Sequence, residues 1–269
     1  MKDCHWRVQS LFAIALILFL APLSSTAAES PLFASLHQFR ISNFRALNSY
    51  YQFSVNGDKT KLDEIVASVN TSNSEMKTVT ENSDGILSKD EVSELTAEFQ
   101  KFKDLMKQNI TDVRKRGYPD LRLVSDMANQ AQTLSQQSEK LYTAALNNAN
   151  ITADSRVESA RAAAVLMAQM MSKYSARSNS SVAQTFQGSE SEAPLDQQAK
   201  EFDTLLAQLK KGKETGDLKQ AIDSISSKWM FIRGSFINYN EKNVPFIIDR
   251  YSKGILDELK TAIQLMTAA

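Results

Sequence analysis

Cysteine and histidine are almost absent from this 269-residue sequence, which contains one cysteine and two histidines. Cys4 and His5 both lie in an N-terminal segment that we expect to be removed, so His37 is the only residue of either type in the predicted mature chain. A chain without a thiol cannot form a disulfide, a Cys/His zinc site or a thiol nucleophile, and one histidine cannot form a paired-histidine metal centre. We therefore expect neither a metal nor a cofactor.

Glycine and proline are also scarce, at 8 and 5 residues, below the average usage of about 7% and 5%. Turns are therefore few and the secondary-structure elements long, which favours helices. The 31 basic and 31 acidic residues leave a formal net charge of zero, so no strong field favours a nucleic acid as a partner. A hydrophobic content of 42% is typical of a globular protein and excludes both wholesale disorder and a multi-span membrane protein.

The first 28 residues have the pattern of a signal peptide. Lys2 and Arg7 form a basic start, residues 11–20 (LFAIALILFL) form an apolar run, and small residues up to Ala28 provide a cleavage site. This run is shorter than the roughly 20 apolar residues that span a bilayer, and no later run approaches that length. We expect cleavage after Ala28 and no transmembrane span in the mature chain; an uncleaved anchor is the alternative.

The absence of cysteine from an exported chain is typical of a bacterial periplasmic protein and unusual for an animal extracellular domain. Asn-x-Ser/Thr sequons would favour a glycosylating host instead, but a chain rich in these residue types produces them by chance. The four sequons are at Asn70, Asn109, Asn150 and Asn179. We therefore predict a periplasmic location.

Apolar residues recur at steps of three and four along nearly the whole chain after residue 29, which is the period of an amphipathic helix. Glycines such as Gly57 and Gly117 end helices, and Pro245 starts the last one. No stretch alternates polar and apolar residues, so we expect no sheet. The pattern predicts an all-α fold, an antiparallel bundle of about eight long helices.

These helices divide into two four-helix sets, at residues 29–154 and 155–269. A polar, glycine-containing linker is expected within the second set at residues 184–193. The two halves would be stacked end to end or fused through shared helices.

The predicted helix from Arg161 to Tyr174, RAAAVLMAQMMSKY, is similar to the signature helix of the sensor domain in type IV pilus chemoreceptors and related nitrate-type sensors, where a run similar to RMLSQRMAKxY recurs. The stretch RISNFRALNSYY, starting at Arg40, resembles the same run more weakly. Val165 and Met170 stand where the family has paired arginines. The residues that match or nearly match are Ala168, Gln169, Met171, Lys173 and Tyr174. The resemblance implies a periplasmic helical sensor module that acts with a membrane receptor.

Arg40 and Arg233 are the candidate ligand-binding residues. Each lies four residues from an apolar residue on either side, so each belongs to the apolar face of its helix. A guanidinium directed into a bundle needs an acidic partner or a bound anion, because burying it unpaired is expensive. The partner would be a small anionic ligand or a carboxylate such as Asp63, Asp249 or Glu258. A structural ion pair, or a stem that reaches solvent, is the simpler alternative.

The stretch TENSDGILSKDE, from Thr80 to Glu91, resembles the calcium loop of an EF-hand. Asp84 and Glu91 occupy ligand positions, but Thr80 takes the first position, where an aspartate belongs. The alternative is an interhelical turn in which Gly85 ends one helix, while Ser88 and Glu91 form a capping box that opens the next.

The sequence contains no nucleophile elbow and no phosphate-binding glycine loop, so we expect no enzymatic activity. Three functions remain. The first is a sensory or ligand-binding module with a partly polar cavity between long helices, acting with a membrane partner. The second is an accessory or scaffold protein of an envelope machine, such as exopolysaccharide, biofilm or pilus assembly, which binds its protein partners through an exposed apolar face. The third is a calcium-responsive helical protein.

Overall fold

The computed structural model describes residues 30–179, 193–212, 214, 216–241 and 243–268. Over these residues the protein has eight helices and no strand, which confirms the predicted all-α class. The helices are α1 (Pro31–Asn56), α2 (Lys59–Asn82), α3 (Lys89–Arg116), α4 (Leu121–Asn148), α5 (Ser155–Asn179), α6 (Leu195–Leu209), α7 (Gly216–Ile237) and α8 (Pro245–Thr267). The predicted signal peptide and nearly all of the predicted linker lie outside the described residues.

The helix ends follow the local signals in the sequence. Gly57 and Gly117 terminate α1 and α3 in the left-handed conformation, at φ values of 71° and 82°, which a residue with a Cβ adopts only with strain. Asp58 and Asp120 cap the N-termini of α2 and α4 by accepting backbone N–H hydrogen bonds. Short turns between capped helices make neighbours in the sequence run in opposite directions.

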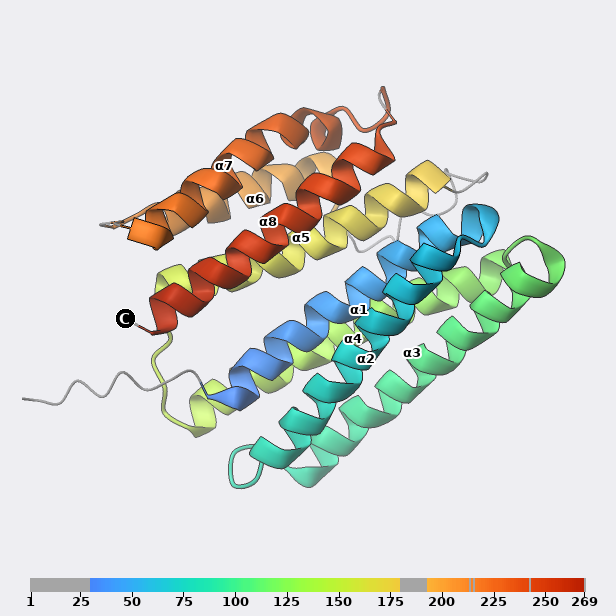
Figure 1. Ribbon diagram of the computed structural model, residues 1–269. Coiled ribbons are helices and arrows are strands. Elements are labelled where there is room, and N and C mark those ends of the chain that lie inside the picture. The colour runs from blue at the N-terminus through green and yellow to red at the C-terminus, as the bar shows by residue number, and fades with distance from the viewer. Residues whose placement is uncertain (1–29, 180–192, 213, 215, 242, 269) are drawn as a thin grey trace, which may run out of the picture.

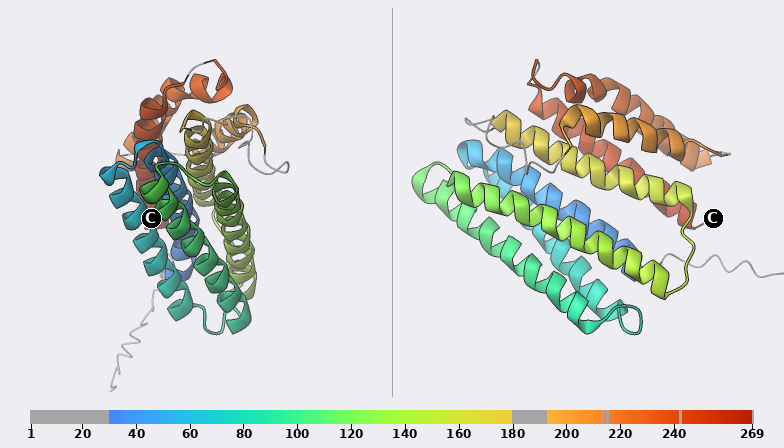
Figure 2. Two further views of the ribbon diagram at one scale, coloured as in Figure 1. Left: turned by 90° about the vertical axis from the view of Figure 1, so that its right-hand side faces the viewer. Right: turned by 180° about the vertical axis from the view of Figure 1, so that it is seen from behind.

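The eight helices form two four-helix sets that lie side by side, α1–α4 and α5–α8 (Figures 1 and 2). Helix α1 packs against α2, α4 and α5, while α5 packs against α1, α6 and α8. The two sets are therefore neither stacked end to end nor fused through a shared helix; they meet along a seam between α1 and α5. Because both are odd-numbered in an alternating chain, α1 and α5 run parallel to each other.

Each set has an aromatic centre of its own. In the first, Phe39 of α1 meets Phe99 of α3 edge to face, with ring centroids 5.0 Å apart. In the second, the Trp229 ring lies 4.4 Å from Phe202 and 5.7 Å from Phe236. Truncating a buried aromatic residue to alanine costs about 3–5 kcal/mol, so these clusters anchor the two sets separately. No helix among the described residues combines the length and apolar character needed to cross a bilayer.

Candidate functional site

A cavity of about 380 Å³ opens beside the seam, where the two sets meet. Helices α4 and α5 both pack against α1 but not closely against each other, so α1 forms the floor between them. The right-hand view of Figure 2 shows α4 and α5 on this side of the molecule. The lining residues come from α1 (His37, Arg40), α4 (Glu139, Tyr142, Thr143, Leu146), α5 (Glu158, Arg161, Ala162, Val165, Leu166, Gln169) and α6 (Gln198, Glu201). A ligand in this space would touch both sets.

Arg40 points into this cavity from α1, as its position on the apolar face predicts. Its side chain is 17% exposed, whereas that of its partner Glu139 is 62% exposed. The guanidinium donates from Nε to Ser135 Oγ and from Nη2 to Glu139 Oε2, both at 3.1 Å. Burial lowers the pKa of Arg40, and the Glu139 carboxylate partly offsets this effect. The acidic partner is thus Glu139, which the sequence analysis did not consider.

A second arginine, Arg161 of α5, reaches the same cavity. Its Nη1 donates to Glu158 Oε1 at 2.6 Å and to the Tyr142 hydroxyl, and Tyr142 donates to the same carboxylate oxygen at 2.6 Å. The Arg161 guanidinium also lies 5.5 Å from the centre of the Tyr142 ring, where a cation is attracted to the π face. The sequence analysis missed Arg161, although it lies four residues from Val157 and from Val165, the same signal that identified Arg40.

His37 lies one helical turn before Arg40 and is buried at the cavity wall. Burial and the nearby charges of Arg161 and Arg40 lower the pKa of His37 to about 3. The imidazole is therefore neutral at any physiological pH. Among the described residues it has no hydrogen-bond partner, and it forms a buried part of the cavity lining.

Helix α6 contributes Gln198 and Glu201 to the opposite wall. Gln198 is only 6% exposed, yet its Oε1 atom has no hydrogen-bond partner in the described part of the chain. Glu201 lies at the exposed rim of the cavity, and no basic group described by the structure pairs with it. A buried amide oxygen without a donor is uncommon in proteins, because leaving it unpaired costs free energy.

Arg233, the other predicted ligand-binding residue, lies on α7 outside this cavity. It forms a bidentate ion pair with Asp203 of α6, with Nε–Oδ1 and Nη2–Oδ2 distances of 3.0 and 2.7 Å. The Trp229 indole N–H donates to the same carboxylate at 2.8 Å. The Arg233 side chain is 42% exposed, so it resembles the predicted structural ion pair. The structure does not bring Arg233 and Arg40 together.

The three acidic partners that the sequence analysis suggested lie elsewhere. Asp63 pairs with Lys59 on α2, and Glu258 pairs with Lys228. Asp249 accepts hydrogen bonds from Asn48 and Gln52 of α1 at 2.9 and 2.8 Å, and Lys253 pairs with it at 2.8 Å.

This Asp249 cluster forms a closed polar network across the seam. Lys253 also bonds Glu64 at 3.0 Å, and the Glu64 carboxylate accepts from Ser49 at 3.0 Å. Burial alone would raise the pKa of Asp249, but the hydrogen bond and charge of Lys253, with the amides of Asn48 and Gln52, lower the pKa below its usual value.

The turn that resembles a calcium loop is an interhelical turn in the structure. Helix α2 ends at Asn82, and Gly85 has a φ of 74°. The backbone N–H of Ser88 donates to Glu91 Oε2 at 2.9 Å, while the Glu91 N–H donates to Ser88 Oγ at 3.2 Å, which is the predicted capping box. The described residues hold no cluster of three or more potential metal ligands of the His, Cys, Asp and Glu types. Calcium binding stays a prediction, which calorimetry with calcium tests.

In comparisons with known proteins, no family model, no curated protein and no solved structure matches this chain.

Proposed function

We propose that this chain is a non-enzymatic, periplasmic helical binding protein, a sensory or ligand-binding module that holds a small polar ligand and acts with a membrane partner. The single observation that carries the proposal is the place of the cavity. It lies beside the seam and is lined by α1 and α4 of one set and by α5 and α6 of the other. Pockets of several hundred Å³ with a few convergent polar groups are the usual form of small-molecule sites.

The groups around the cavity support binding rather than catalysis. Arg40 and Arg161 are held by Glu139 and Glu158, which fixes their positions. His37, with a pKa of about 3, is a poor base at neutral pH. Such an arrangement orients and selects a ligand without moving a proton.

The seam offers a route from the ligand to a partner. A ligand that prefers one separation of α4 and α5 would bias how the two sets sit against each other, because only α1 lies between them. A ligand shifts such an equilibrium only by as much as its affinity for the two arrangements differs. Ligand binding would thereby change the relative position of the two sets at the outer surface of the bundle, where a membrane partner would bind.

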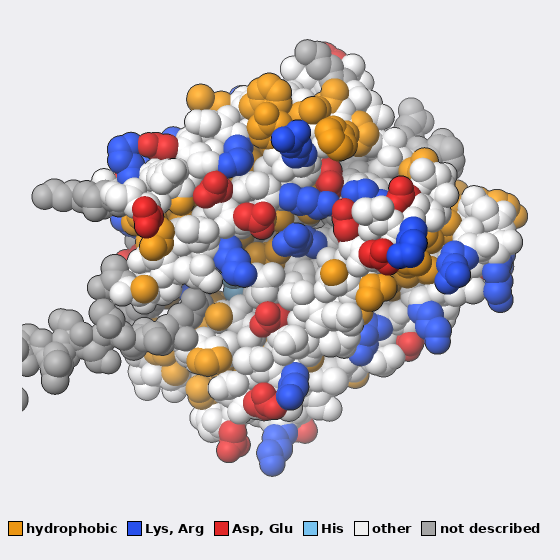
Figure 3. All heavy atoms as spheres, in the orientation of Figure 1, with side chains coloured by type: hydrophobic (Ala, Val, Ile, Leu, Met, Phe, Trp, Pro, Cys, Tyr) orange, Lys and Arg blue, Asp and Glu red, His pale blue; other side chains and the backbone are white. Residues whose placement is uncertain are grey.

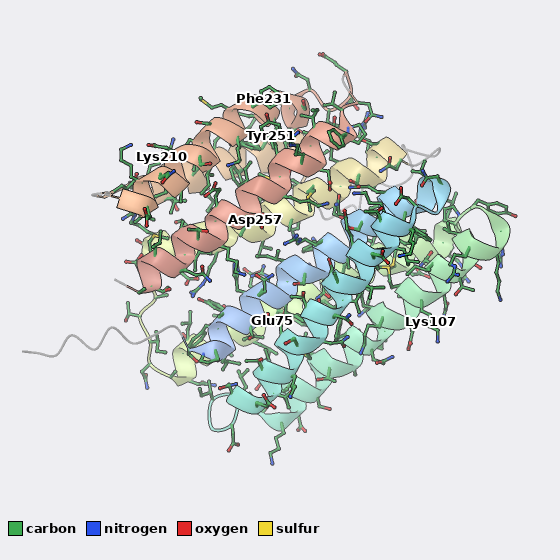
Figure 4. All side chains as sticks on the ribbon, viewed as in Figure 1. Glu75, Lys107, Lys210, Phe231, Tyr251 and Asp257 are labelled. Atoms are coloured by element: carbon green, nitrogen blue, oxygen red, sulfur yellow. The ribbon has the colours of Figure 1, made fainter. Side chains whose placement is uncertain are left out.

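An exposed apolar patch on the second set favours a second function, an accessory or scaffold role in an envelope machine. We define this patch as the exposed Met230 and Phe231 of α7 and Phe246 of α8, with the half-buried Tyr251 of α8. The rings of Phe231 and Tyr251 lie 4.6 Å apart and are labelled side by side in Figure 4. In Figure 3, apolar side chains gather over α7 and α8, whereas mixed charges run across the middle of this face. A large exposed apolar patch commonly marks a contact surface.

A thermal-shift screen of the purified chain tests the ligand-binding proposal. The panel contains amino acids, amines, polyols and small anions, and binding raises the melting temperature by mass action. Ala162 is exposed and lines the cavity, so Ala162→Trp fills the cavity from its mouth and should abolish the response. Ala67→Trp, at an exposed position of α2, is the matched control and should retain it.

No shift with any member of the panel would contradict the ligand-binding proposal. In that case, crosslinking from a photoreactive amino acid placed at the exposed Met230 tests the scaffold function in envelope extracts. That function predicts a discrete crosslinked protein that Phe231→Ser abolishes.

A further inference from the structure

The ligand class of the cavity follows from the charges that line it. The two guanidiniums are already held by carboxylates inside the same cavity. Arg40 Nη2 lies 3.1 Å from Glu139, and Arg161 Nη1 lies 2.6 Å from Glu158. An anion entering the cavity would have to displace these carboxylates or approach them closely, and like charges at short range repel. The arginines are therefore not vacant anion receptors.

A third carboxylate, Glu201, makes the net charge of the described cavity lining negative. The cavity lining contains two arginines and three glutamates, and burial keeps His37 uncharged because it lowers its pKa. Glu201 has no basic partner among the described residues. The described lining thus carries one negative charge in excess, which raises the local concentration of a cation.

Several oxygen acceptors of the cavity lining have no partner among the described residues. Glu139 uses only Oε2 and Glu158 only Oε1 within the described part of the chain, so each retains one free oxygen. The buried side chain of Gln198 has an Oε1 to which no described group donates. A ligand that pairs with these oxygens has to bring N–H or O–H groups, and an ammonium group brings three donors together with a positive charge.

The remaining lining limits the size and shape of the ligand. Leu146, Val165 and Leu166 supply an apolar part of the wall. A volume of about 380 Å³ corresponds to about a dozen water molecules at about 30 Å³ each. The space suits a short hydrocarbon chain with polar ends.

From these observations we infer that the cavity binds a small organic ammonium ion, with its amine held by Glu201 and the free glutamate oxygens of the wall. This inference rests on the proposed ligand-binding function and narrows it to one ligand class. A small anionic ligand, which the sequence analysis named as one partner for the arginines, is the competing outcome.

The test compares three four-carbon probes that share one hydroxyl end and carry an ammonium, a hydroxyl or a carboxylate group at the other: 4-aminobutan-1-ol, butane-1,4-diol and 4-hydroxybutanoate. Isothermal titration calorimetry of the mature chain should show the amine binding at least about tenfold more tightly than the other two, a difference of about 1.4 kcal/mol. Glu201→Gln removes the excess charge at an exposed position, so the fold should be unaffected. It should weaken amine binding about tenfold and leave diol binding unchanged.

Asp257→Asn is the matched control, because Asp257 is an exposed carboxylate of α8 outside the cavity lining (Figure 4). It should bind the amine like the unmodified chain. Equal binding of the amine and the diol, tighter binding of the hydroxy acid, or an unchanged amine affinity in Glu201→Gln would overturn the inference. Each of these three outcomes leaves the proposed ligand-binding function intact, provided that Ala162→Trp abolishes the binding that is observed. If no probe and no panel compound binds, both the inference and the proposed ligand-binding function are overturned.

Discussion

The seam between α1 and α5 carries two polar regions of opposite character. Toward the C-terminal ends of the two helices, the Asp249 network joins Asn48 and Gln52 of α1 to Lys253 of α8 and Glu64 of α2. Toward their N-terminal ends lies the cavity, which contains paired arginines but also the Gln198 acceptor and Glu201, neither of which has a partner in the described parts of the chain.

The two regions differ in whether all of their polar groups have a partner among the described residues. In the Asp249 network each charge meets an opposite charge, and the amides of α1 fill the remaining positions. Buried polar groups that are fully satisfied fix one packing arrangement, whereas incompletely satisfied ones leave free energy for a ligand to recover. The same helices thus carry a fully paired polar network at one end and a cavity with polar groups available to a ligand at the other.

The largest effect is expected from breaking the closed network. Asp249→Ala leaves Lys253, Asn48 and Gln52 without their shared acceptor in a buried position. Removing one member of a buried pair costs about 3–5 kcal/mol, and urea unfolding should show a loss of this size. Asp257→Asn, on the exposed side of the same helix, should change the free energy of unfolding by about 0.5 kcal/mol or less. Equal small losses in both variants would contradict the role of the network.

The pH dependence of the free energy of unfolding should reveal His37, which lines the cavity. The pKa of His37 is lowered from 6.5 to about 3 by burial and by Arg161 and Arg40. Between pH 6.5 and 3, the unfolded chain therefore binds a proton at His37 that the folded chain does not. The contribution of the neutral imidazole to the free energy of unfolding is complete above pH 6.5 and is lost as the pH falls toward 3. The slope for one group is about 1.4 kcal/mol per pH unit, which gives a loss of about 2 kcal/mol between pH 6.5 and 5.

This window separates His37 from the carboxylates, because the pKa values of Asp249 and Glu64 are lowered below their ordinary range near 4. Urea unfolding at pH 6.5 and 5 measures the loss, and His37→Gln should remove most of it. A variant that retains the full pH dependence would show that another group is responsible.

Arg40→Met should cost far less than Asp249→Ala. The Glu139 side chain is 62% exposed, so the carboxylate returns to water when its partner is removed. We expect a change of about 1 kcal/mol or less in the free energy of unfolding, measured with urea. A loss of several kcal/mol would show that the cavity end is as tightly integrated as the closed network.

The smallest effect is expected at the outer ion pair. Arg233→Gln removes a bidentate contact to Asp203, but the guanidinium side chain is 42% exposed and Trp229 keeps its hydrogen bond to the carboxylate. An exposed pair contributes about 0.5 kcal/mol, so thermal and urea unfolding should barely change. A large loss of unfolding free energy in Arg233→Gln would contradict the expectation that this exposed ion pair contributes less than the buried Asp249 network.

The sequence predicts helix boundaries well because they depend on neighbours in the chain. The Ser88/Glu91 capping box, the glycine stops at Gly57 and Gly117, and the start of α8 at Pro245 are all observed. The apolar spacing also places Arg40 correctly on the buried face of α1. At Arg233 the same spacing leads instead to the ion pair that the sequence left as the alternative, because on an outer helix a long side chain can reach solvent.

Local pattern alone therefore determined the helical class, the caps and the direction in which Arg40 points, since these follow from interactions within a few residues of one helix. Only the tertiary structure decided that the two sets meet side by side, that Glu139 rather than Asp249 pairs with Arg40, and that Arg161, His37 and Gln198 share one cavity. These facts depend on which helix faces which, and residues about 100 positions apart are brought together by packing geometry that no local period encodes.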